Sequence, residues 1–348
     1  MNETLSFVDS SGMPERVRVL DIGSDDPYQP GTGFRTRTLR LEDGRTLLQR
    51  RLLPTFVQRA EWVDALEAEI RSGLALIRAF SEVAYPPEFT RLAGYAIEEE
   101  SPYLLLDPLR GGQPMAEIAR GLVLSTEQKK FESSLFRALR LLQWAALVHR
   151  SISPATVRWD GTRVQLTHLS TADQVGRPRQ RLGTLPWASP EQREGIGLND
   201  HRDDIWSAGQ LVYFVANSRE ASGHRVPPLA GPVRDDLLKD VFAERAEQRP
   251  DARTMLRRVA AADPWDDLGR PPDPLRAARQ RFAALLADKG PLAWPLSPAV
   301  RRPDPPEADT PSDAEAQQES GTAWTRRRSR AGGAGRWGTG HRRAEEGG

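Results

Sequence analysis

The hydrophobic pattern of this chain changes its period along the sequence, and this change constrains the fold more than any other feature. Residues 35–41 alternate between polar and apolar side chains, the Asp43-Gly44 pair is a typical hairpin turn, and residues 46–53 form the predicted return strand. Two further strands are predicted at 94–97 and 103–106. The first part of the chain is therefore predicted to build a sheet.

Helical spacing dominates the remainder. Apolar residues at helical spacing predict a helix within 57–80, and a capping box at 125–128 precedes a second apolar stripe. Short strands are predicted around Val157 and at 164–166. Further helices are predicted at about residues 203–217, 234–246 and 251–262, with one more from 274 to 288. Strands followed by helices predict an α+β fold with two lobes.

Composition excludes several classes of protein. The 348 residues include no cysteine, so disulfides and thiolate metal sites are excluded, and the net charge of +1 gives no overall field toward nucleic acid or membrane. No apolar run approaches the roughly 20 residues of a membrane-spanning helix. The first residues lack the pattern of a signal peptide. A cytoplasmic protein is expected.

Several different short motifs follow one another along the chain. The central one, residues 147–157, reads Leu-Val-His-Arg-Ser-Ile-Ser-Pro-Ala-Thr-Val, and Leu-Thr-His-Leu-Ser follows at 166–170. The others are Gly31-Thr-Gly33-Phe34, Glu69 on the first helix, the apolar run 103–109 before Gly111-Gly112, Gly183 to Glu191, Asp204 to Gly209, and Gln248 to Arg253.

In this order, the motifs resemble those of the protein kinase family, in the style of bacterial serine/threonine kinases. The resemblance implies a two-lobed protein-kinase-like domain over residues 16–262, with an N-lobe at 16–107 and a C-lobe at 108–262. An N-terminal extension at 1–15, a linker with one helix at 263–290 and a disordered charged tail at 291–348 complete the expected domains.

The residues that the family uses for structure are present. The resemblance implies that Glu191 forms a buried ion pair with Arg249, and that Asp204 accepts hydrogen bonds from the backbone of His149 and Arg150. These five residues would hold the fold whether or not the chain catalyses a reaction.

The positions that the family uses for catalysis carry other chemistry. Ser151 occupies the position of the family's catalytic base, and Ser153 that of the lysine two residues later. Thr156 and His168 occupy the positions of the two metal ligands. Arg50 occupies the position of the lysine that contacts the nucleotide phosphates. A serine hydroxyl has no basicity near neutral pH, and imidazole is a poor ligand for magnesium. No lysine precedes position 129, so no small shift of the alignment could place a lysine at the position of Arg50.

The nucleotide pocket implied by the resemblance is also altered. Leu48 replaces the small ceiling residue and Arg158 places a charge on the floor, and both oppose binding of a flat apolar ring. The vestigial pocket comprises Gly31, Gly33, Leu48, Arg50, Glu69, Leu106, Asp107, Leu109 and Arg158. We expect no metal and no cofactor, or at most weak ATP binding without magnesium.

Two basic segments are candidates for partner binding. Arg177, Arg179 and Arg181 could dock an acidic or phosphorylated partner, although a solvated charged loop is the simpler explanation. In the tail, an acidic stretch at 304–319 precedes an arginine-rich stretch at 326–343. Disorder explains this composition, so nucleic-acid and membrane binding are not expected. A protein partner of unknown identity is expected instead.

From these residues we expect a catalytically inactive pseudokinase, not an enzyme, acting as a scaffold or allosteric regulator in signalling. Two alternatives stay open. One is a nucleotide- or anion-sensing module that uses Arg35, Arg37, Arg50 and Arg158. The other is an atypical active serine/threonine kinase that relocates its carboxylates, with Asp173 as the nearest candidate beyond the motif.

Overall fold

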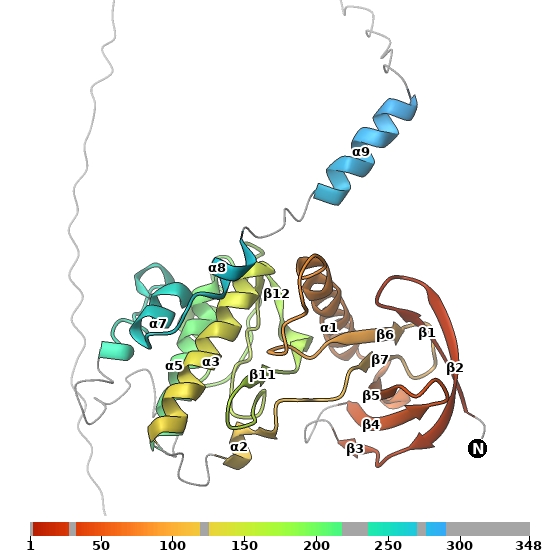
Figure 1. Ribbon diagram of the computed structural model, residues 1–348, viewed down its shortest axis with the longest axis horizontal. Coiled ribbons are helices and arrows are strands. Elements are labelled where there is room, and N and C mark those ends of the chain that lie inside the picture. The colour runs from red at the N-terminus through yellow and green to blue at the C-terminus, as the bar shows by residue number, and fades with distance from the viewer. Residues whose placement is uncertain (1–2, 28–32, 119–124, 218–235, 270–275, 290–348) are drawn as a thin grey trace, which may run out of the picture. The chain divides into compact units, whose positions relative to one another are not determined.

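The computed structural model describes residues 3–27, 33–118, 125–217, 236–269 and 276–289. Its main sheet has seven strands in the order β2-β1-β6-β7-β5-β4-β3, and β2 also pairs with β4, so the sheet curls back on itself (Figure 1). The strands are β1 (Thr4–Asp9), β2 (Pro14–Ile22), β3 (Asp26–Pro27), β4 (Phe34–Leu41), β5 (Thr46–Leu52), β6 (Leu92–Ala96) and β7 (Tyr103–Leu106). The sheet predicted from the alternating pattern is confirmed.

Alternation along the strands separates two layers of core. On β7, Tyr103 and Leu105 pack inside the curled sheet with Leu39 and Leu41. Leu104 and Leu106 face the other way, toward helix α1 (Ala60–Ala79). On α1, Gly73 allows the close approach of β6, because a Cβ there would lie 2.8 Å from the Cβ of Leu92.

The first residues belong to this sheet. β1 pairs with both β2 and β6, and its inward side chains Leu5 and Phe7 are 3% and 4% exposed. The expectation that residues 1–15 form an extension outside the domain is therefore wrong for the described part of that segment. The alternation of Leu5 and Phe7 indicates a strand, but the motif resemblance begins only at residue 16.

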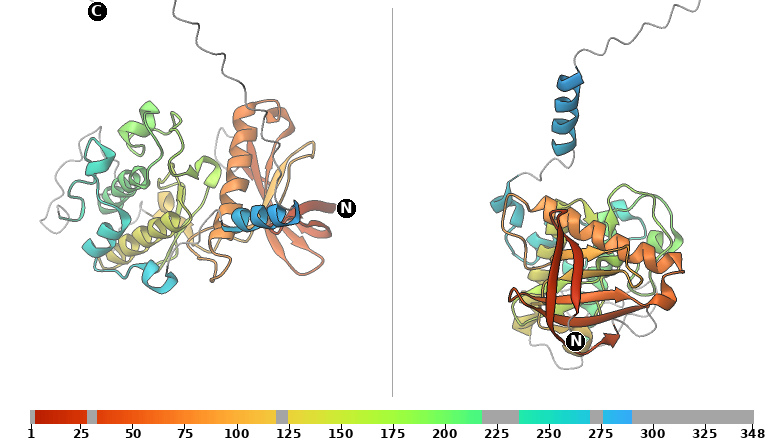
Figure 2. Two further views of the ribbon diagram at one scale, coloured as in Figure 1. Left: turned by 90° about the horizontal axis from the view of Figure 1, so that it is seen from above. Right: turned by 90° about the vertical axis from the view of Figure 1, so that its right-hand side faces the viewer.

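The helical part is built around α3 (Ser125–Trp144) and α5 (His201–Asn217), which lie beside the sheet and α1 (Figure 2). Its other helices are α2 (Met115–Ile118), α4 (Pro190–Glu194), α7 (Ala252–Arg258), α8 (Pro264–Leu268) and α9 (Arg276–Lys289). Three short 3-10 helices, η1 (Pro54–Phe56), η2 (Leu169–Thr171) and η3 (Ala246–Gln248), complete the helical elements described.

Two small sheets run through this helical part. One has the order β11-β10-β8, from β11 (Val164–Leu166), β10 (Val157–Trp159) and β8 (Gln113–Pro114). The other pairs β9 (Leu147–Val148) with β12 (Asp173–Gln174). These short strands bracket residues 149–156 and 167–172, so they fix the two ends of the central motif.

Two further sequence predictions differ from the structure. The helix predicted at 234–246 does not form in the described residues 238–245, which are turns and bends. The start of the expected linker, residues 263–268, packs on α3 instead: Arg140 stacks 3.5 Å from the centre of the Trp265 ring and pairs with Asp263 at 3.0 Å. The tail at 291–348 lies outside the described residues.

The mixture of strands and helices agrees with the predicted α+β class. Its division into two lobes remains a prediction. Among the described residues, no helix combines the length and the apolar character needed to cross a bilayer.

Candidate functional site

The central motif is anchored by one carboxylate of α5. Asp204 accepts hydrogen bonds from the backbone N–H of His149 at 2.7 Å and of Arg150 at 2.8 Å. Arg150 has a φ of +67°, and these two bonds hold the backbone in that left-handed turn. Burial raises the pKa of Asp204 to about 7, although the two backbone donors oppose this rise. The expected anchoring of the loop by Asp204 is confirmed.

His149 stabilises the same loop and is uncharged. Its Nε2–H donates to the carbonyl of Thr167 at 2.9 Å, which ties the loop to the segment after β11. Burial lowers the pKa of His149 to about 4, and Nδ1 has no hydrogen-bond partner among the described residues. This histidine is therefore a structural part of the loop.

The side chain at the first expected metal position closes the loop. The Thr156 hydroxyl donates to the carbonyl of Ser151 at 2.6 Å and accepts from the backbone N–H of Ser153 at 3.0 Å. The Ser153 hydroxyl lies 3.3 Å from the same oxygen. Since a hydroxyl has one proton and two lone pairs, these contacts leave Thr156 no capacity for a metal ion.

His168 occupies the second expected metal position in a left-handed backbone conformation, with a φ of +66°. Its Nδ1 lies 2.5 Å from the Thr167 hydroxyl. Burial lowers the pKa of His168 well below its usual value, and the nearby charges of Arg50 and Arg158 lower it further. A neutral, buried imidazole does not suit magnesium, which prefers oxygen ligands.

The carboxylates closest in sequence are engaged elsewhere. Asp160 accepts from the backbone N–H groups of Thr162 and Arg163 in the turn between β10 and β11. Asp173 pairs with Arg150 at 3.3 Å and accepts from Asn199 at 3.0 Å. Across the described ranges, no cluster of three or more His, Asp or Glu side chains is arranged to hold a metal ion. Magnesium therefore does not fit the positions where the resemblance places it.

Arg50 on β5 forms a buried ion pair with Glu69 on α1. The side chains are 2% and 5% exposed, so the pair links the sheet to its helix in a nearly dry environment.

The remaining residues of the expected pocket are spread over neighbouring elements. Leu48 and Leu106 are paired across β5 and β7, and Arg158 donates to the carbonyl of Gly112. Burial lowers the pKa of Arg158. Gly33 lies against Phe56, whose ring a Cβ at Gly33 would approach to 2.7 Å, and Gly31 lies outside the described residues.

Asp107 and Leu109 lie in the connection between β7 and β8, where the N–H of Asp107 donates to the carbonyl of Arg91 at 2.9 Å. Farther along, the buried Gln165 accepts from the N–H groups of both Arg110 and Gly111 at 3.0 Å each. Sequence reasoning missed Gln165, because nothing near it in sequence marks its partners 54 and 55 residues away.

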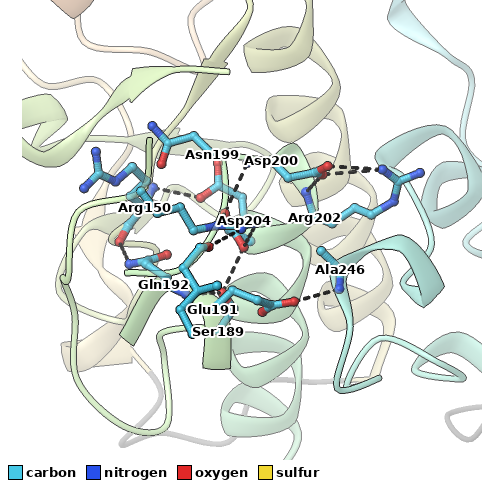
Figure 3. Close-up of polar contacts among 12 residues, drawn as sticks. Arg150, Ser189, Glu191, Gln192, Asn199, Asp200, Arg202, Asp204 and Ala246 are labelled. Carbon is cyan, nitrogen blue, oxygen red and sulfur yellow. Dashed lines mark hydrogen bonds and ion pairs between the residues drawn. The ribbon is translucent and has the colours of Figure 1, made fainter. Parts of the chain in front are cut away.

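A second network fixes the segment after the central motif (Figure 3). Glu191 pairs with Arg249 at 2.6 Å and accepts from the N–H of Ala246 at 2.7 Å, so the predicted ion pair is confirmed. Gln192 donates to the carbonyl of Arg150 at 2.6 Å and thereby ties α4 to the loop.

Asp203 is the main contact that the sequence reasoning missed. It is fully buried and accepts from the Ser189 hydroxyl and from Arg179, both at 2.9 Å. Its position beside Asp204 is the only signal in the sequence. Arg179 is therefore bound within the fold. Arg181 donates to the carbonyl of Arg193 at 3.1 Å. Arg177 is 57% exposed and lies beside Asp173.

Two cavities adjoin the loop. One of about 830 Å³ is lined by residues that include Ser151, Ser153, Leu182, Gly183, Thr184, Trp187, Ala188 and Phe214. The other, of about 500 Å³, lies between α1 and residues 170–182 and includes Arg150 and Asp173. Ser151 thus stands at the wall of a groove that is mostly apolar.

Comparison with known proteins places the chain beside protein kinases. It is 24% identical to the serine/threonine-protein kinase RAD53 of Saccharomyces cerevisiae over 174 residues, 44% of this chain and 20% of that protein. It is 25% identical to Aurora kinase A-B of Xenopus laevis over 51% of the chain and 47% of the relative. It is 24% identical to human ribosomal protein S6 kinase alpha-1 over 60% of the chain and 30% of the relative.

The chain thus matches less than half of the length of these relatives. No family model matches it. The expectation that the chain is not an enzyme is contradicted by these matches, because the relatives are kinases and point to kinase activity. The motifs in order, the anchored loop and these relatives identify the chain as protein kinase-like.

Proposed function

We propose that the chain is an atypical serine/threonine protein kinase-like signalling protein that binds ATP weakly and presents a hydroxyl-bearing peptide to it in the groove beside Ser151. The observation that carries this proposal is the anchored loop. Asp204 and Gln192 hold residues 149–151 from two sides, and Ser151 lines the groove of about 830 Å³. The division into two lobes, with the nucleotide between them, is part of the proposal.

The proposed chemistry lacks a usual base. A positioned general base contributes roughly 10²- to 10⁴-fold in rate, and Ser151 cannot supply that contribution near neutral pH. Transfer to a serine or threonine peptide is therefore expected to be slow. Positioning is the main source of catalysis that such a site retains.

Nucleotide binding is proposed to proceed without magnesium held by the protein. Thr156 and His168 are both engaged in hydrogen bonds with neighbouring residues and offer no carboxylate. Positive charge supports phosphate binding instead. Arg158 acts on His168, and Arg50, although it is paired with Glu69, contributes to the same local field. Leu48 and Arg158 oppose tight binding of the adenine ring, so the affinity is expected to be weak.

That local positive charge also favours a second candidate function. In a phosphate-sensing module, occupancy of the cleft would alter how the chain binds a signalling partner. The surface at Arg177 and Arg181 remains the proposed contact for an acidic or phosphorylated partner. A cytoplasmic location and the identity of the partner remain predictions.

Thermal denaturation of the full chain tests both candidates. ATP is expected to raise the Tm by a similar amount with magnesium or with EDTA, because binding to the folded state stabilises it by mass action. The Arg158→Ala variant is expected to lose most of this shift, whereas Arg16→Ala, at an exposed position of β2, keeps it. No shift with ATP under either condition would overturn the nucleotide site, and a shift that requires magnesium would overturn its metal-free form.

A further inference from the structure

A third cavity, separate from the proposed nucleotide and peptide sites, is strongly basic. It has a volume of about 990 Å³ and lies between the first half of α3, the turn between β10 and β11, the loop before β6 and residues 259–262. It shares no lining residue with the two cavities beside the central loop. A ligand of this cavity would therefore contact none of the residues that line those two cavities.

The lining is cationic although the chain as a whole is nearly neutral. Four cationic side chains line the cavity, Lys129, Lys130, Arg137 and Arg163, against the single carboxylate of Glu88. The net charge of the whole chain is only +1. The chain has four lysines in total, so half of them lie at this one place.

Two of these four charges, those of Lys129 and Lys130, have no carboxylate partner within the described part of the chain. Glu88 is 4% exposed and is already bound to Arg137 at 3.1 Å. Asp160 offsets part of the charge of Arg163, which helps to lower the pKa of this carboxyl, and it also accepts from the backbone N–H groups of the turn at 2.6 and 2.8 Å. Lys129 and Lys130 are exposed, and no described carboxylate lies within ion-pair distance of either.

The rest of the lining indicates what kind of anion would fit. Val259 and the three alanines 260–262 leave room for small side chains. The hydroxyls of Ser133 and Ser134 are used within the protein, the first donating to the carbonyl of Lys129 and the second accepting from the N–H of Val164, both at 2.9 Å. Recognition must therefore come from charge and from contact with small apolar groups.

A peptide matches this chemistry better than a nucleic acid. None of the described lining residues is aromatic, so the cavity offers no surface on which bases could stack. We propose that the cavity is a docking site for an acidic peptide segment of a partner protein. Its carboxylates would contact Lys129, Lys130 and Arg163, and its small side chains would lie over residues 260–262.

The test uses the full chain and a short fluorescein-labelled peptide of alternating Glu and Ala, with binding followed by fluorescence anisotropy. The Lys129→Glu/Lys130→Glu variant is expected to bind at least about tenfold more weakly, which corresponds to about 1.4 kcal/mol. Lys239→Glu/Arg245→Glu is the matched control, because it changes the net charge equally at exposed residues outside the cavity. A Gln-Ala peptide of the same length is expected not to bind.

A photo-crosslinking form of the peptide locates the contact. Crosslinks are expected in residues 129–137 or 160–163. Equal weakening in both variants, or crosslinks confined to the arginine-rich stretch 326–343, would overturn the docking site. Tighter binding of duplex DNA than of the peptide, with the same dependence on Lys129 and Lys130, would replace the acidic peptide with a nucleic acid and overturn the proposal in that form.

Discussion

Arg50 and Glu69 form an ion pair whose two side chains are 2% and 5% exposed, at the point where β5 meets α1. The pair stands where a kinase-like chain would carry a lysine, and it keeps the sheet and helix together with a larger, permanently charged group. The chain has thus kept the link between these elements while changing its chemistry.

Removing one partner of this pair is expected to destabilise the fold strongly. Arg50→Ala should lower the free energy of unfolding by about 3–5 kcal/mol, because it leaves the buried Glu69 carboxylate without its cation. Arg50→Met combined with Glu69→Leu should be far less harmful, since neither charge remains. Urea denaturation measures both, with Arg71→Ala at an exposed pair as the control. Equal losses in the single and double variants would contradict a paired role.

Thr156 is expected to act in the loop structure. Thr156→Val removes the hydroxyl that bridges Ser151 and Ser153, leaves buried backbone groups unpaired, and should cost about 1–3 kcal/mol of stability. Thr46→Val, at an exposed position of β5, is the matched control and should change stability little. A similar small change in both variants, measured by chemical denaturation, would show that the bridge contributes nothing.

Stability is expected to fall on acidification below about pH 6.5. The pKa of His149 is about 4 in the fold, below its ordinary value of 6.5, so the unfolded chain binds the proton first and stability is lost as pH falls from 6.5 toward 4. His201, whose pKa burial also lowers to about 4, acts in the same direction.

Asp204 acts in the opposite direction over the same range. Its pKa is raised from 3.8 to about 7, so the contribution of its protonated form is present at low pH and is lost as pH rises toward 7. The pH dependence of stability that is due to His149 is therefore obtained as a difference. The free energy of unfolding of His149→Gln is subtracted from that of the wild type at each pH from 4 to 7.5. A difference that is constant over this range would contradict the burial of a neutral His149.

The local hydrophobic pattern was enough to predict the elements whose own residues are regularly spaced. The apolar stripes of α1 and α3 and the hairpin of β4 and β5 are periodic over many residues, and each of these elements forms where it was predicted. The turns at 238–245 have helix-compatible composition, but their conformation depends on packing against α5 and α7, which spacing does not reveal. β1 was overlooked because the motif resemblance begins only at residue 16, although Leu5 and Phe7 alternate and β1 forms a hairpin with the next strand, β2.

In the candidate site, some contacts could likewise be predicted from the sequence and others could not. Residues at motif positions, such as Glu191, Arg249 and Asp204, could be paired from the sequence because the resemblance supplied their partners. Asp203 and Gln165 could not be, since each binds groups more than ten residues away that no motif connects to it. The engagement of Arg179 by Asp203 likewise removes one of the three arginines first expected to face a partner.

The measurement closest to the central claim is the transfer of labelled γ-phosphate from ATP to a serine- and threonine-containing peptide. We expect slow transfer by the wild type, about 10²- to 10⁴-fold below that of a kinase with a positioned base. Transfer should be lost in the Arg50→Met/Glu69→Leu variant and retained in Asp173→Asn. Wild-type transfer no higher than that of the double variant would contradict a kinase-like activity at this site, and transfer that depends on Asp173 would contradict a site without a carboxylate base.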